Sequence, residues 1–312
     1  MQKDLISVVI PVYGDKRLVR ILYSRLIENL SKLDVDYEII MVCDACPYGS
    51  ADEIRELALE DNRVKFIDLQ RNFGQHIAIK AGIDAANGDY TMVMDCDLQD
   101  NPQDIPRFYN KIKECNCDVI YGEREEREEK FIKKFYSKAA NKLIQAMGDV
   151  PFFEGRNVSN FSIFNKKVLQ ELKNSKEPYF VFGTIIDWAG FTVEYINIRQ
   201  EKREIGKSGY NFIKGLNHLK RIIINNSNRP LMFAGCCASI MFLLCILFAA
   251  KLFVDYFVFH YKILGYTSLM VAIFLIAGLL FTYLRILGVY IGQLFKISQH
   301  RSLYVVKRKM NL

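Results

Sequence analysis

The sequence predicts an α/β protein in two parts, a doubly wound, mostly parallel sheet followed by a C-terminal two-helix transmembrane hairpin. Short β-branched apolar runs alternate with helical patterns between residues 5 and 122, which is typical of a parallel sheet joined by crossover helices. Charged residues are frequent as far as about residue 229 and scarce from there to about residue 292. The first part therefore has the composition of a soluble domain, and the second that of membrane-spanning helices.

The alternating patterns place the elements of the soluble domain in order. Strands are predicted at 5–13, 37–43, 64–69, 90–97 and 117–122. Helices are predicted at 18–33, 50–61, 74–86 and 105–115, and the second has a capping-box pattern with Ser50 as N-cap and Glu53 as the acid. Ligands of such sheets bind outside the carboxyl ends of the strands. A dinucleotide-binding fold is disfavoured, because the turn PVYGDKRL (11–18) has one glycine where G-x-G-x-x-G is required.

Two basic, amphipathic segments follow, at 129–148 and 209–226. Each could be a helix that packs its apolar face on the domain, or a helix that lies in the membrane interface. The interface is favoured for 209–226, because this segment directly precedes the apolar region. For 129–148 both interpretations stay open.

Two apolar runs, 230–253 and 266–292, predict the transmembrane helices. Runs of about 24 to 27 residues give helices of about 36 to 40 Å, enough to cross a hydrocarbon core of ~30 Å. A buried hairpin in a soluble core is disfavoured, because each run contains a single charge, Lys251 or Arg285, near its end. Basic residues flank both ends of the region, which predicts that both ends are cytoplasmic and attract membrane lipid.

These patterns divide the chain into four parts. They are a cytoplasmic domain at 1–208, an interfacial helix at 209–229, two transmembrane helices within 230–293, and a basic cytoplasmic tail at 294–312. The N-terminus enters a strand without a signal peptide, so we expect a multi-pass protein of the plasma (inner) membrane with its domain in the cytoplasm. The net charge of +7 comes without an RNA-binding or zinc-finger motif, so nucleic acid is not an expected partner. The eight cysteines have no zinc-site spacing and are expected to be reduced thiols.

Three carboxylates, Asp95, Asp97 and Asp100, follow the fourth predicted strand in the stretch DCDLQDNP (95–102). Side chains at i and i+2 of a strand point the same way, so Asp95 and Asp97 are expected to project together, with Gln99 within reach. Carboxylate oxygens without a neighbouring lysine are ligands for Mg²⁺ or Mn²⁺, and such an ion leaves positions for substrate phosphates. The alternative is a polar loop with an acidic helix start. The sequence favours a metal site that binds a diphosphate.

Five segments carry a resemblance to a known family. They are SVVIPVYG (7–14), RNFGQHIAIKAGIDAANGDYTMVMDCDLQDNP (71–102), YGEREER (121–127), REIGKSGYNF (203–212) and LRILGVYIGQLFKISQHRSLYVV (284–306). Together they resemble the family 2 glycosyltransferases with a GT-A fold. Within that family they are most similar to the polyprenyl-phosphate branch, which includes dolichyl-phosphate mannosyltransferases and bactoprenol glucosyltransferases.

The resemblance implies an inverting, metal-dependent hexosyltransferase. It would move a sugar from a UDP-, GDP- or dTDP-sugar to a polyprenyl phosphate of the undecaprenyl type at the cytoplasmic membrane face, and further copies of the chain are possible partners. The implied nucleotide-binding residues are Pro11, Tyr13, Asp15, Asp44 and Asp95, and the implied metal ligands are Asp95, Asp97 and Gln99. The implied phosphate- and acceptor-binding residues are Arg124, Arg203, Lys207 and Ser208, with Asp97, Arg124 and Arg203 as catalytic residues. Arginine suits phosphate because of its planar fork, although EREEREE (123–129) also offers surface ion pairs.

The chain departs from the family pattern at several motifs. It has Gly14-Asp15 for Asn-Glu, CDACPYGS (43–50) for D-D-G-S, and Asn160 for a carboxylate that could act as a base. Two further elements, GKSGY (206–210) and GVY (288–290), also differ. These departures leave the sugar and nucleotide open and favour an unusual donor.

Two alternative functions stay open. The first is extension of a lipid-linked saccharide at a hydroxyl acceptor in cell-surface polysaccharide synthesis. A hydroxyl would need a base, whereas a lipid phosphate is already anionic at pH 7. The second is a non-catalytic membrane scaffold, which the intact Asp95, Asp97 and Gln99 disfavour.

Overall fold

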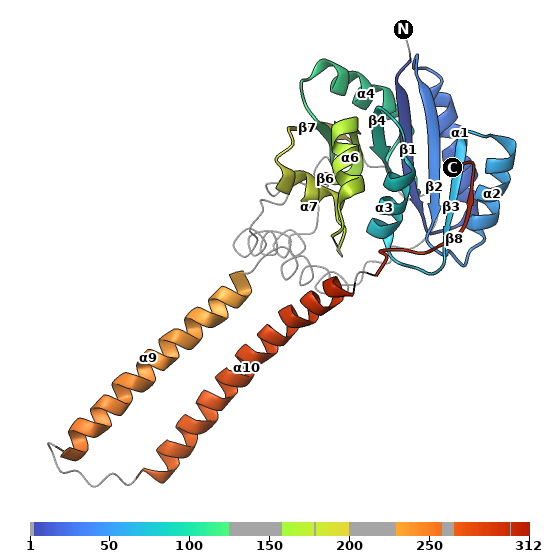
Figure 1. Cartoon of the computed structure of the whole chain (residues 1–312). Helices are drawn as coiled ribbons and strands as arrows, with labels where there is room; N and C mark the ends of the chain where they lie inside the picture. The colour runs from blue at the N-terminus through green and yellow to red at the C-terminus, as the bar shows by residue number, and fades with distance from the viewer. Residues whose placement is uncertain (1–2, 125–157, 178, 200–228, 258–264, 300) are drawn as a thin grey trace. The chain divides into compact units, whose positions relative to one another are not determined.

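The computed structural model describes residues 3–124, 158–177, 179–199, 229–257, 265–299 and 301–312 (Figure 1). The chain divides into two compact units. The first comprises residues 1–141, 150–211 and 302–312, and the second comprises 142–149 and 212–301. The segments 129–148 and 209–226, which the sequence predicts to be amphipathic helices, lie outside the described residues.

The described part of the first unit contains one sheet of eight strands in the order β7-β5-β6-β4-β1-β2-β3-β8 (Figure 1). The strands are β1 (Leu5–Val12), β2 (Asp36–Cys43), β3 (Val64–Leu69), β4 (Tyr90–Val93), β5 (Val119–Arg124), β6 (Val158–Asn165), β7 (Val193–Ile198) and β8 (Val306–Met310). Strands β6 and β8 are antiparallel to their neighbours, and the other pairs are parallel. The predicted mostly parallel α/β sheet is confirmed.

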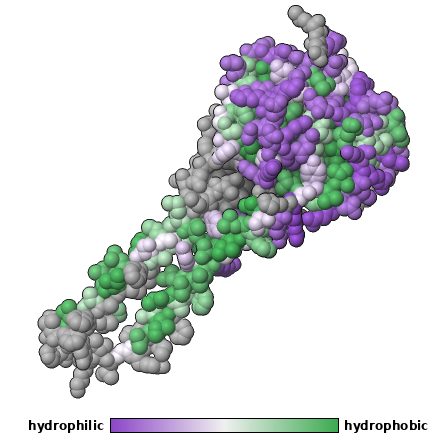
Figure 2. Space-filling model, viewed as in Figure 1, coloured by the Kyte–Doolittle hydropathy of each residue, from purple (hydrophilic) through white to green (hydrophobic). Residues whose placement is uncertain are grey.

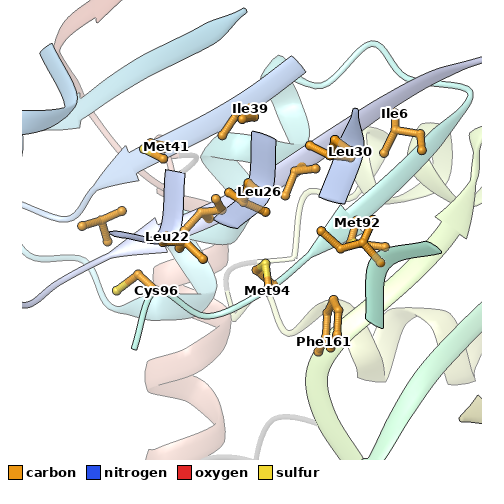
Figure 3. Close-up of a cluster of buried hydrophobic side chains, with 14 of the residues drawn as sticks. Ile6, Leu22, Leu26, Leu30, Ile39, Met41, Met92, Met94, Cys96 and Phe161 are labelled. Atoms are coloured by element: carbon orange, nitrogen blue, oxygen red, sulfur yellow. The ribbon is translucent and has the colours of Figure 1, made fainter. Parts of the chain in front are cut away.

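Helices cover both faces of this sheet, which confirms the doubly wound arrangement. The helices are α1 (Lys16–Leu30), α2 (Ser50–Glu60), α3 (Gln75–Ala85), the short 3₁₀ helix η1 (Pro102–Asp104), α4 (Ile105–Glu114), α6 (Lys166–Asn174) and α7 (Phe182–Ala189). Apolar residues of α1, α2 and α4 form one buried cluster with one face of the sheet, and those of α3, α6 and α7 form a second cluster with the other face. In Figure 3, Leu22, Leu26 and Leu30 of α1 lie against strand residues of the first cluster.

Two local predictions were wrong. Strand β4 ends at Val93, so Asp95 and Asp97 lie in the following turn instead of in the strand. Ser50 is the first residue of α2 and not its N-cap, because Gly49 takes the left-handed conformation at the cap (φ 78°). The Ser50 hydroxyl donates instead to the Gly14 carbonyl at 2.6 Å, and the Glu53 carboxylate pairs with Arg20 at 2.6 Å.

Two further features of the first unit were not predicted. The segment Val306–Met310, which the sequence places in a basic tail, forms strand β8 on the open edge of β3. Cys115 and Cys117, between α4 and β5, form a disulfide where reduced thiols were expected. Strand β8 was not predicted because its sequence, VKRKM, is mostly charged. An edge strand needs little apolar character on its solvent side, so β8 lacks the apolar pattern that predicts a strand.

The described part of the second unit contains α9 (Arg229–Phe257) and α10 (Tyr266–Ser298), which contact each other. Among the described residues, Leu275–Phe295 is the segment that is long and apolar enough to cross a membrane, and Leu231–Ile240 is a shorter apolar segment. In Figure 2 the described surface of these helices is mostly hydrophobic, whereas the face of the first unit in view is mostly hydrophilic. The second crossing, and with it the hairpin, stays a prediction.

Candidate functional site

The candidate site lies at the sheet edge where β1, β2, β4 and β5 end and where β6 begins. Because β6 is antiparallel to β4 and β5, its first residues meet the end of β5 and the residues that follow β4. This topology brings together side chains far apart in the sequence. They are Tyr13, Asp15, Asp44, Asp95, Asp97, Gln99, Asp100 and Arg124, with Ser159 and Asn160 from β6.

Asp44, at the end of β2, holds the loop before α3. It is buried, with 3% of its surface exposed. Its two carboxylate oxygens accept hydrogen bonds from the backbone amides of Phe73 (2.7 Å) and Gly74 (2.8 Å). Gly74 takes a φ of 96°, which favours glycine, and α3 begins at the next residue. Asp44 therefore fixes residues 70–74 against the end of β2.

The turn after β1 presents Tyr13 to solvent, while its neighbours are engaged within the fold. Pro11 is buried inside β1, opposite Val42. Asp15 is the N-cap of α1, and its carboxylate accepts from the Arg17 backbone amide (2.9 Å) and side chain (2.7 and 3.0 Å). These bonds to Arg17 lower the pKa of Asp15 to about 2. Tyr13 is thus the member of the predicted set at this turn that is most open to a ligand, with half of its surface exposed.

Tyr48 is a candidate site residue that the sequence analysis missed. Its ring lies 6.2 Å from that of Tyr13 in an edge-to-face arrangement, and 61% of its surface is exposed. The two turns are joined through Gly14, whose amide donates to Cys46 Sγ (3.3 Å) and whose carbonyl accepts from Cys46 Sγ (3.2 Å). Two exposed tyrosines on bonded turns form a surface on which a planar base could stack. The available signal was an aromatic residue within the inserted CDACPYGS segment.

Asp95 is the centre of the acidic cluster after β4. Its Oδ1 accepts from Gln75 Nε2 (2.6 Å) and from Asn160 Nδ2 (3.4 Å). Burial, followed by the nearby Asp100 and Asp97 carboxylates, raises the pKa of Asp95 to about 7. Among the described residues, the negative charge of the cluster is therefore only partly balanced.

Arg124, at the end of β5, faces this cluster through Ser159. Its Nη2 donates to the Ser159 hydroxyl (3.0 Å) and lies 3.9 Å from Asp100 Oδ1. The Ser159 hydroxyl in turn donates to the Asp100 carboxylate at 3.1 Å. Burial raises the pKa of Asp100, and Arg124 opposes that rise. The guanidinium Nε is buried and has no hydrogen-bond partner among the described residues. Among the described residues, Arg124 pairs with Asp100 of the cluster, and residues 125–129 of EREEREE lie outside the described residues.

The residues present fit a divalent ion that takes part of its coordination from a substrate. Within the described ranges, no group of three or more His, Cys, Asp or Glu side chains is arranged to hold a metal. The predicted set has two carboxylates and one amide, which suits an ion that also binds phosphates and water. Asp97 Oδ1 accepts a hydrogen bond from the backbone amide of Gln99 at 3.2 Å, and Leu98 between them has a left-handed φ of 59°. This turn, which lies beyond the end of β4, fixes the Asp97 carboxylate.

Three predicted phosphate-binding residues, Arg203, Lys207 and Ser208, lie outside the described residues. The structure brings Arg124 to the acidic cluster and gives no position for these three. Their proposed roles therefore come from the sequence.

Comparisons with known proteins agree with this architecture. Residues 7–186 match the model of the family described as "Glycosyl transferase family 2". "Uncharacterized glycosyltransferase YkcC" from Bacillus subtilis is 32% identical over 98% of this chain and 94% of its own length. "Undecaprenyl-phosphate 4-deoxy-4-formamido-L-arabinose transferase" from Proteus mirabilis is 30% identical over 97% of this chain and 93% of its own length. The crystal structure of mannosyl-3-phosphoglycerate synthase from Rubrobacter xylanophilus shares the fold, with a TM-score of 0.50 and 11% identity over 75% of each chain.

Proposed function

The chain belongs to glycosyl transferase family 2, and from this premise we propose that it transfers a sugar from a nucleotide-diphosphate sugar to a polyprenyl phosphate. The observation that carries the proposal is the acidic cluster of Asp95, Asp97 and Asp100 beside Arg124 at the sheet edge. A cluster of this kind suits a metal-bound diphosphate. The match of nearly the whole chain to the undecaprenyl-phosphate transferase of Proteus mirabilis supports the acceptor.

Each part of the site has a task in the proposed reaction. Asp95, Asp97 and Gln99 would hold Mg²⁺ or Mn²⁺, which supplies positive charge to the departing diphosphate. Tyr13 and Tyr48 would bind the base, and Asp44 would fix the neighbouring loop through the amides of Phe73 and Gly74. Arg124, Arg203, Lys207 and Ser208 are proposed to bind phosphate oxygens of donor or acceptor.

The proposed transfer needs alignment of charged groups more than it needs a base. A phosphate oxygen of the acceptor bonds to the anomeric carbon while the bond from that carbon to the nucleotide diphosphate breaks, which inverts the configuration. The acceptor oxygen is already ionised at pH 7, since the second pKa of a phosphate monoester is about 6. Asn160, whose amide lies 3.4 Å from Asp95, has no basic group to offer, and a phosphate acceptor does not require one.

We also propose that α9 and α10 are two membrane crossings and that the first unit is cytoplasmic, in the plasma membrane. Leu275–Phe295 has the length and composition of a crossing. Large apolar side chains of both helices are exposed to the surroundings, among them Phe233 and Leu247 of α9 and Phe281 and Leu294 of α10. Exposed apolar surface of this kind suits lipid better than water.

The proposal is tested with the purified full-length protein and radiolabelled UDP-, GDP- and dTDP-sugars. Each donor is combined with polyprenyl phosphate or with a lipid-linked saccharide, in Mg²⁺, in Mn²⁺, or after chelation with EDTA. We expect label on polyprenyl phosphate with one donor, dependent on the metal. Label only on the saccharide would support the hydroxyl-acceptor alternative, and undiminished transfer after chelation would contradict the metal site.

A further inference from the structure

The last residues of the chain are bound into the first unit on both sides of strand β8. β8 pairs antiparallel with β3, with Phe66 opposite Met310 and Asp68 opposite Arg308. Beyond the strand, Asn311 Nδ2 donates to the carbonyls of Ala58 (2.7 Å) and Val64 (3.0 Å). Before it, Leu303 and Tyr304 pack against the second hydrophobic cluster. Residues 302–312 are therefore an integral part of the sheet domain.

This segment contacts the loop that Asp44 holds. The backbone amide of Gln70, the first residue after β3, donates to the Val305 carbonyl at 2.9 Å. Four residues later the loop is held at its other end, where Asp44 accepts from Phe73 and Gly74. The C-terminal segment thus fixes the start of loop 70–74, and Asp44 fixes its end.

The same segment contacts the helix that follows this loop. The Tyr304 hydroxyl donates to Asp84 Oδ2, in the last turn of α3, at 2.8 Å. The first residue of α3, Gln75, donates to Asp95 at 2.6 Å. Loop 70–74 and α3 therefore connect the C-terminal segment to both Asp44 and Asp95.

A third contact of the C-terminal segment is the approach of two of its cations to Asp68 of β3. Asp68, opposite Cys43 at the end of β3, is buried, with 4% of its surface exposed. Lys307 Nζ and Arg308 Nε lie 3.8 and 3.9 Å from its Oδ2. Asp68 pairs across the sheet with Cys43, the residue before Asp44. Loss of the Lys307 and Arg308 cations would therefore leave an uncompensated buried carboxylate beside the site.

We propose that residues 302–312 are a positioning segment of the nucleotide-sugar site, holding loop 70–74 and α3 so that nucleotide affinity depends on the C-terminus of the chain. This inference rests on the proposed function, because it assigns the nucleotide to the Asp44 and Asp95 edge. The segment does not touch the proposed reacting atoms. It acts through Gln70, Asp84 and Asp68.

The test compares three variants of the full-length protein with the wild type. Tyr304→Phe removes the hydrogen bond to Asp84 and keeps the ring, and a stop after Arg301 removes the segment. Lys309→Ala, at an exposed position of β8, is the matched control. The readouts are the Kd of the preferred nucleotide and amide hydrogen exchange without nucleotide, followed separately in residues 70–75, in β1 and in β4.

We expect faster exchange in residues 70–75 for Tyr304→Phe and for the truncation, with β1 and β4 unchanged. The Kd should rise by about five-fold for Tyr304→Phe, as for the loss of one hydrogen bond, and by more for the truncation. Lys309→Ala should match the wild type. A synthetic peptide of residues 302–312 should restore the affinity of the truncated protein.

Unchanged exchange in residues 70–75 for both variants would overturn the inference. Equal acceleration in β1 and β4 would also overturn it, because the segment would then stabilise the whole domain and not the site. If the wild type binds none of the nucleotides, the proposed function fails. The exchange measurement, which uses no nucleotide, still decides whether the segment holds the loop.

Discussion

Among the described residues, the acidic cluster after β4 combines three carboxylates with the guanidinium of Arg124. Arg124 reaches Asp100 through Ser159, while Asp95 receives amide hydrogen bonds from Gln75 and Asn160. Amides offset less charge than a cation does, which agrees with the raised pKa of about 7 for Asp95. A divalent ion would supply the missing positive charge.

The first prediction concerns the metal ligand Asp97. Asp97→Asn keeps the size of the side chain and removes its charge, so we expect turnover to fall by about 100-fold or more, as for loss of several kcal/mol of transition-state stabilisation. Turnover is measured with the preferred donor at a series of Mn²⁺ concentrations. The melting temperature should stay within a few degrees of the wild type, and a variant with most of its activity would refute the assignment.

The second prediction concerns the aromatic pair. Tyr48→Ala should weaken nucleotide binding by about 1–3 kcal/mol, the usual contribution of stacking between a base and an aromatic ring. Tyr48→Phe keeps the ring and should bind like the wild type. Isothermal titration with the nucleoside diphosphate measures both. Equal affinities for the alanine and phenylalanine variants would exclude Tyr48 from the base site.

Sequence reasoning located the chemistry of the site better than its geometry. The positions of Asp95 and Asp97 follow from the end of an apolar run, but both residues lie beyond β4, and Asp97 accepts a hydrogen bond across a turn with Leu98 at positive φ. Such a turn has no simple sequence signal, since leucine rarely adopts this conformation. Tyr48 was missed because exposed aromatic residues in insertions follow no periodic pattern.

Helix α3 packs closely against the sheet at Gly82. A Cβ built on Gly82 would overlap Val9 Cγ1 of β1 and lie 3.2 Å from Val42 Cγ2 of β2. This contact lets the helix axis approach β1 and β2, which end directly before Tyr13 and Asp44. The same helix begins with Gln75, the donor to Asp95. The distance between the α3 axis and the sheet therefore determines where the first turn of the helix lies relative to the candidate site.

The third prediction follows from that contact. Gly82→Ala should lower the free energy of unfolding by about 1–3 kcal/mol, because the methyl group overpacks a filled space. Gly14→Ala is the control, since its nearest neighbour would be Leu18 Cδ1 at 3.9 Å. Denaturant unfolding of both variants checks the difference. Equal stabilities would show that α3 can move away from the sheet at little cost.

The first half of the domain could be predicted element by element, whereas the second half could not. Strands β1–β3 and helices α1–α4 have long apolar patterns with clear periods, and their bounds agree with the predictions to within a few residues. Strand β6 (VSNFSIFN) and strand β7 (VEYINI) mix polar and apolar residues, and β8 (VKRKM) carries three cations. These strands are specified by their partners in the sheet, which lie far away in the sequence.

At the scale of the molecule, the chain leaves the sheet domain, forms α9 and α10, and returns to the same domain. Residues 1–141, 150–211 and 302–312 belong to the first unit, and α9 and α10 belong to the second. A helical segment with both ends in one folded domain differs from a terminal anchor, because cutting it out leaves β8 without its covalent link.

The fourth prediction concerns the orientation of the proposed hairpin. A cysteine at position 262, between α9 and α10, should react with a membrane-impermeant maleimide in intact cells. A cysteine in place of Leu312 should react only after permeabilisation. The unsubstituted protein gives the background from its own eight cysteines. Labelling at both positions in intact cells would contradict the proposed orientation.

The antiparallel pairing of β8 with β3 restricts how the chain can be threaded through a bilayer. Two strands of one sheet must be on the same side, so the number of crossings between them is even. If α10 crosses, a second segment between β3 and β8 must cross as well, and among the described residues α9 is the candidate. The pairing also sets an order during biosynthesis, because β8 follows α9 and α10 in the chain and can close the sheet only after both helices have been made.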